Sequence, residues 1–168
     1  IKAIIHQLKF VDYKEENAFI KNLDRLKKEA ETATFPTKPI LHSMLAEMYW
    51  QYYQNNRYRF LNRSETVEFD DSKIETWSLA KIVKETQNQY SQSLAFAEQS
   101  KREAISDFEE IYVRGNDLGM KYQSTLLDFL ANRAVKFYES QEPGLTKPDY
   151  FFTLDKEEYL ADANTFSK

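Results

Sequence analysis

Apolar side chains recur at helical spacing over most of the chain, and they are densest between residues 40 and 61. One face of that stretch carries apolar residues three or four positions apart, namely Leu41, Met44, Leu45, Met48 and Tyr52. The adjoining faces add further apolar surface, from Ala46, Tyr49, Trp50 and Tyr53. A helix that is apolar nearly all round must be surrounded by other elements, because exposure would forfeit the burial of several large rings. The pattern therefore predicts that residues 40–61 form the central helix of an all-α domain.

Other parts of the chain predict the helices that surround this one. An apolar stripe at the same period runs through residues 1–11, 14–33, 77–96 and 124–138. Ser124 or Thr125 is the expected N-cap of the last of these helices. The pattern lapses after the third, so we expect a break between Ala97 and Ser106. Residues 155–163 predict one more short helix.

The predicted fold class is all-α, with antiparallel helical hairpins packed as an irregular bundle or a short solenoid-like stack. The composition agrees, because 3 Gly and 4 Pro are too few for a turn-rich sandwich or barrel. A linker containing Pro and Gly at residues 140–148 predicts an all-helical domain over residues 1–142. Residues 143–168 are then a linker and a short terminal helix that lead to a following module. Because the first residue is Ile1 and not Met, we expect the chain to be a piece of a longer polypeptide.

Charge and residue usage narrow the functional classes. The net charge of −4 at pH 7 argues against a nucleic-acid partner, whose binding surface would show a basic patch. No apolar run approaches the roughly 18 residues of a membrane span. The chain has no Cys, which excludes disulfides, thiol catalysis and cysteine-ligated zinc.

The sequence shows no constellation of catalytic or metal-binding residues. His6 and His42 are the only histidines, and neither has the spacing of a metal site. Gly115 and Gly119 lack the Lys-Ser/Thr of a phosphate-binding loop, so we interpret them as helix terminators. We therefore expect no catalytic residue, no cofactor, no metal ion and no enzymatic activity.

A partner contact is the site that the sequence suggests. Tyr53, Arg57 and Arg59 lie near the polar end of the predicted central helix, and Tyr and Arg are favoured anchors at interfaces. The aromatic run from Tyr49 to Tyr53 has two interpretations. It is either buried core, the commoner outcome for rings at helical spacing, or a platform that stacks a glycan or a peptide. Deep burial of Trp50 and Tyr53 would favour core, and their exposure in a shared cleft would favour the platform.

Three runs of sequence resemble a known family. They are PILHSMLAEMYWQYYQNNRYRFLNRSE, the segment that starts at Trp77, and STLLDFLANRAVKFY. Together they resemble, over residues 38–140, a helical region on the N-terminal side of very large bacterial alpha-2-macroglobulin-like proteins. The resemblance implies a cell-envelope protein, periplasmic or associated with the outer membrane, that traps or inhibits proteases. The thioester of covalent trapping requires a Cys, which this chain lacks, so no functional residue carries over from the family.

Two functional hypotheses stand at this point. The first is a non-enzymatic structural or protein-interaction module of such a larger envelope protein. Its partners are the other domains of the same longer chain and, through the parent protein, proteases. The alternative is a free-standing helical binding protein with an aromatic groove for a glycan or a peptide near Tyr53.

Overall fold

The computed structural model describes residues 1–14, 18–61, 70, 73–112 and 122–140. Within these residues the chain forms helices and no β-strand, which confirms the predicted all-α class. An isolated bridge between Ala104 and Thr125 is the extended pairing found in this part of the chain. The linker and terminal helix predicted over residues 143–168 lie outside the described residues, as do Gly115 and Gly119.

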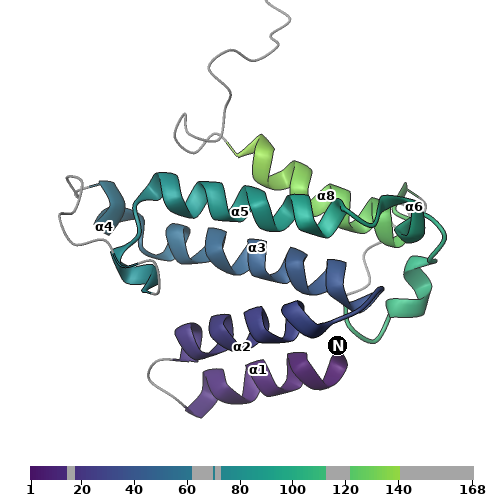
Figure 1. Cartoon of the computed structure of the whole chain (residues 1–168), viewed down its shortest axis with the longest axis horizontal. Helices are drawn as coiled ribbons and strands as arrows, with labels where there is room; N and C mark the ends of the chain where they lie inside the picture. The colour runs from purple at the N-terminus through teal and green to yellow at the C-terminus, as the bar shows by residue number, and fades with distance from the viewer. Residues whose placement is uncertain (15–17, 62–69, 71–72, 113–121, 141–168) are drawn as a thin grey trace, which may run out of the picture.

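The described helices follow one another along the chain as shown in Figure 1. The α-helices are α1 (Lys2–Lys14), α2 (Ala18–Thr32), α3 (Thr37–Asn55), α4 (Arg57–Leu61), α5 (Leu79–Leu94), α6 (Ala97–Ser100) and α8 (Leu126–Glu139). Two short 3₁₀ helices, η1 (Ile74–Thr76) and η2 (Ile105–Phe108), flank α5 and α6. The predicted break between Ala97 and Ser106 is confirmed, because α6 ends at Ser100 and η2 begins at Ile105. Among the described residues, no helix combines the length and the apolar character needed to cross a membrane.

Helix α3 lies at the centre of the described structure, as its apolar pattern predicts. It packs against α5 over most of its length and against α2 on the opposite side, while α1 lies beyond α2 (Figure 1). Helix α8 packs against both α3 and α5. The buried residues of α3 therefore come from nearly its whole circumference, and Ile40, Ala46, Tyr49 and Tyr53 are all at most 5% exposed.

The central helix begins earlier and ends earlier than predicted. It includes Pro39 in its first turn, because the first N–H groups of a helix have no intrahelical partner and Pro costs little there. It stops at Asn55 because Asn56 leaves the helical conformation, and the side-chain amide of Asn56 donates to the Tyr52 carbonyl oxygen at 2.8 Å. Residues 57–61 then form the separate helix α4.

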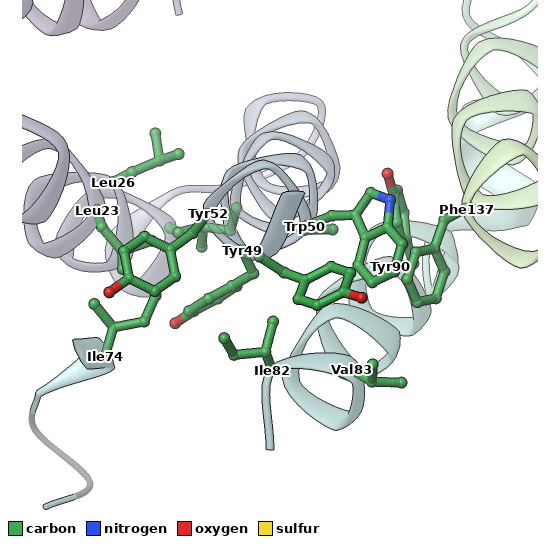
Figure 2. Close-up of a cluster of buried hydrophobic side chains, with 14 of the residues drawn as sticks. Leu23, Leu26, Tyr49, Trp50, Tyr52, Ile74, Ile82, Val83, Tyr90 and Phe137 are labelled. Carbon is green, nitrogen blue, oxygen red and sulfur yellow. The ribbon is translucent and has the colours of Figure 1, made fainter. Parts of the chain in front are cut away.

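Aromatic rings fill the core where α3 meets its neighbours (Figure 2). Tyr49 stacks on Trp77 with ring centroids 5.5 Å apart, and Trp50 meets Phe137 edge-on at 4.9 Å. Leu26 of α2 is fully buried on the other side of α3. Rings at these separations add favourable quadrupole contacts to the burial of large apolar areas, so the aromatic run of α3 is structural core.

Hydrogen bonds at its first residues fix where helix α8 begins. Thr125 is the N-cap, as predicted, and its hydroxyl accepts from the backbone N–H of Asp128 at 3.2 Å. The Asp128 carboxylate accepts in return from the backbone N–H of Thr125 at 2.9 Å. These two bonds complete a capping box. Burial alone would raise the pKa of Asp128, but the hydrogen bonds from Thr125 and Ser124 outweigh it and hold that pKa below its usual range.

Candidate functional site

The structure separates the three residues predicted to contact a partner. Tyr53 is fully buried and packs between the rings of Trp50 and Phe60, at centroid distances of 5.0 and 5.6 Å. Arg57 and Arg59 lie on α4 and are exposed. Helix α3 ends before Asn56, so the two arginines belong to the separate helix α4. This helix packs Phe60 against the core and leaves the arginines on the surface, whereas Tyr53 belongs to the interior. Trp50 is also buried, so these rings form no open aromatic platform.

His42 is part of a hydrogen-bonded chain of side chains between α3 and α5. The Gln89 amide donates to Glu85 at 2.8 Å, so its oxygen faces His42 and accepts from the imidazole Nδ1 at 2.7 Å. The Nδ1 atom therefore carries a hydrogen. Within the described part of the chain, no group of three His, Cys, Asp or Glu side chains is placed to hold a metal ion. His6 is exposed on α1.

A hollow of about 480 Å³ opens between α1 and α8, with α3 as its floor and residues 105–112 at one end. Most of its surface is apolar, contributed by Ile5, Ile40, Met44, Phe108, Ile111 and Phe129. Its charged groups are Lys9 of α1 and Arg133 of α8. An apolar concavity with few polar groups is the usual form of a binding site.

A second hollow of about 330 Å³ continues the first along α3. The two hollows share Ile5, Lys9, Met44 and Arg133, and the second extends to Gln51. We call the combined feature the α1–α8 groove, defined by the residues that line these two hollows.

Arg133 sets one wall of this groove through a cluster of polar contacts. Its Nε donates to the Ser43 hydroxyl at 2.9 Å, and its guanidinium lies 3.5 Å from the Glu47 carboxylate. Glu47 also accepts from the Tyr90 hydroxyl at 3.4 Å. Burial and the Glu47 charge both raise the pKa of Tyr90, with burial the larger cause. The guanidinium carbon also lies 5.7 Å from the centre of the Phe129 ring, a cation–π distance.

The end of the groove near residues 105–112 is tied to α1 by an ion pair. The Lys2 ammonium lies 2.8 Å from the Glu110 carboxylate. The hydrogen bond and the positive charge of Lys2 lower the pKa of Glu110. Both side chains are largely exposed, so the pair contributes little to the stability of the fold.

Another hollow of about 500 Å³ lies between α2, α3 and α5, and most of the side chains that line it are polar or charged. Lys27, Lys38, Glu31 and Glu85 all line it, so both signs of charge are present. The Lys27 ammonium lies 5.7 Å from the ring centre of Tyr49. This surface gives no preference for a ligand charge and offers less apolar area than the α1–α8 groove, so that groove is the better candidate site.

No family model, no curated protein and no solved structure matches the chain.

One residue of the sequence indicates this groove, although its spacing alone did not identify a site. Arg133 falls on the apolar stripe of α8, four residues after Phe129 and three after Leu130. A charged residue on an apolar stripe indicates either a buried polar partner or an opening in the core. Arg133 shows both, because it donates to Ser43 and also lines the groove.

Proposed function

We propose that this chain is a non-enzymatic structural and protein-interaction module of a larger alpha-2-macroglobulin-like protein of the cell envelope, of the protease-trapping type. The α1–α8 groove is the observation that carries the protein-interaction role in this proposal. Apolar concavities with a few polar groups are where proteins commonly bind their partners and ligands.

The chemistry of the groove supports binding. Its floor and walls are mainly aliphatic and aromatic side chains, and neither histidine of the chain lines it. Ser43 is 2% exposed, and its hydroxyl accepts a hydrogen bond from Arg133, a cation that cannot act as a base for a nucleophile. Burial of apolar surface is therefore what this groove offers to a partner.

The proposed parent protein rests on the three runs of sequence over residues 38–140 that resemble the macroglobulin-type proteins. In this account the partners of the module are other domains of the same longer chain, and proteases are reached through the parent. The alternative, a free-standing binding protein with an aromatic groove, loses support because Tyr53 and Trp50 are buried.

An immunoblot of fractionated source cells, with an antibody raised against this 168-residue chain, tests the proposal. We expect a membrane-associated band many times larger than 20.0 kDa. A soluble band at 20.0 kDa would contradict the proposal and would favour a chain that works alone.

A further inference from the structure

The charges along the α1–α8 groove are unevenly distributed. Lys9 and Arg133 line both hollows from opposite walls. Among the described residues, the hollow of about 480 Å³ has no acidic side chain in its lining. Glu47 lines the other hollow, where its carboxylate accepts from the Gln51 amide at 3.1 Å and from the Tyr90 hydroxyl at 3.4 Å. The deeper part of the groove is therefore an apolar surface flanked by two cations.

The groove has the length and shape to hold a helix. Its floor runs along α3 from Ile40 to Gln51, a distance of about 16 Å at the rise of an α-helix, or about three turns. Helix α1 lines both hollows, and α8 forms the opposite wall of the first. The second hollow is bounded by α2, at Phe19 and Asn22, and by Arg133 of α8. An open trough with helical walls and an apolar floor is the form that receives the apolar face of another helix.

Arg133 retains capacity to bind an additional carboxylate. Its Nε is engaged by Ser43 at 2.9 Å, but its contact with Glu47 is 3.5 Å long, beyond a well-formed charged hydrogen bond. Its side chain is 29% exposed, so the guanidinium reaches the groove surface. A partner carboxylate there would accept a shorter hydrogen bond from the Arg133 guanidinium, and Lys9 would face that carboxylate from the other wall.

We infer that the α1–α8 groove binds an amphipathic helix from another domain of the same longer chain. The apolar face of this helix fills the hollow, and its edge carries an Asp or Glu opposite Lys9 and Arg133. This inference rests on the proposed function and specifies the chemistry of the partner. The match of an anionic edge to the two cations is what favours this occupant over an uncharged apolar helix.

A displayed peptide library tests the inference on the whole 168-residue chain. The library consists of helices about 14 residues long, with Leu fixed at i, i+4 and i+7 and the flanking positions randomised. Selected peptides are sequenced, and their affinities are measured by fluorescence anisotropy. The chain variants are Lys9→Glu and a matched control, Lys28→Glu, since Lys28 is also an exposed helical lysine but lies on α2 and lines neither hollow.

We expect the selected helices to be enriched in Asp or Glu at one flanking position. Lys9→Glu should weaken their binding about tenfold, because an attraction becomes a repulsion, whereas Lys28→Glu should leave the affinity unchanged. When the Lys9→Glu variant is used as the binding target, the selected peptides should be enriched in Lys or Arg at the same position. Both variants are checked by circular dichroism for native helix content.

Three results would overturn the inference. They are selected helices without acidic enrichment, equal effects of the two lysine variants, and a groove occupied by a second copy of the chain, seen as a dimer by light scattering. Loss of the inference in these ways would leave the proposed function standing, because the immunoblot tests that function separately.

Discussion

The guanidinium Nε of Arg133 on α8 donates to the hydroxyl of Ser43 on α3 at 2.9 Å, across ninety residues of sequence. Ser43 is almost completely buried, whereas Arg133 is partly exposed. The bond therefore joins the interior of the domain to its surface. It fixes α8 against the central helix and also holds the remaining guanidinium nitrogens at the wall of the α1–α8 groove.

Ser43→Ala should lower the free energy of unfolding by about 1–2 kcal/mol, because it leaves the Arg133 Nε without its acceptor. Chemical denaturation measures the change. Ser91→Ala is the matched control, since Ser91 is also inside a helix but exposed, and its substitution should change stability by less than about 0.5 kcal/mol. Equal effects of the two variants would contradict a structural role for the Ser43 bond.

The capping box of α8 makes the stability of the domain depend on acid pH. The pKa of Asp128 is lowered in the folded state, so its carboxylate stabilises the fold above its usual pKa and this contribution is lost as the pH falls through the lowered value. Between about pH 5 and pH 2, the wild-type chain should lose more stability than Asp128→Asn.

Thermal unfolding across this pH range measures the difference. Asp107→Asn, which removes an exposed carboxylate of η2, is the control, and its stability should depend on pH as that of the wild type does. If the stability of Asp128→Asn fell with pH as steeply as that of the wild type, the capping box would not be the cause of the pH dependence.

Truncation of Tyr53 and truncation of Arg59 should change the stability of the domain by different amounts. Tyr53→Ala removes a fully buried ring from the core and should cost about 3–5 kcal/mol of unfolding free energy. Arg59→Ala changes an exposed side chain of α4 and should cost less than about 0.5 kcal/mol. Urea denaturation of the two variants distinguishes core from surface. A Tyr53→Ala variant as stable as Arg59→Ala would show that this ring is not part of the core.

The contrast between Tyr53 and Arg59 also shows what the sequence could predict. The all-round apolar character of residues 40–61 predicted the central position of α3, and the spacing at Thr125 predicted the start of α8. The helix break at Asn56 was missed because it depends on a side-chain amide that bonds the preceding turn, a local competition that apolar periodicity does not report.

The groove could not be predicted from spacing, because it depends on how distant segments meet. Lys9, Met44 and Arg133 belong to three helices, and only their packing brings them to one surface. Met44 falls on the apolar stripe of α3 and was expected to be core, but it is partly buried and forms the groove floor. Periodicity identifies which residues are apolar, whereas the tertiary arrangement decides which of them remain open.

Alkaline pH should destabilise the domain through two buried tyrosines. Burial, followed by nearby carboxylates, raises the pKa of Tyr49 and of Tyr90 well above the usual 10.0. The stability they contribute is present below about pH 10 and is lost as the pH rises further, because the unfolded chain releases these protons first. Tyr49→Phe and Tyr90→Phe should each flatten the fall in stability above that pH.

Denaturation at a series of alkaline pH values measures this effect. Tyr58→Phe is the control, because Tyr58 is 82% exposed, and it should keep the wild-type dependence on pH. If all three variants showed the same dependence, burial of Tyr49 and Tyr90 would not be its cause.

The central claim is that this module meets another part of a larger chain at the α1–α8 groove. Amine-reactive cross-linking of the parent protein isolated from the source cells, followed by mass spectrometry, tests it most directly. We predict cross-links from Lys9, at the groove, to lysines of the same polypeptide outside this 168-residue sequence, with few from the exposed Lys28 of α2. Cross-links of Lys9 confined to the 168 residues, or external cross-links equally frequent at Lys28, would contradict the account.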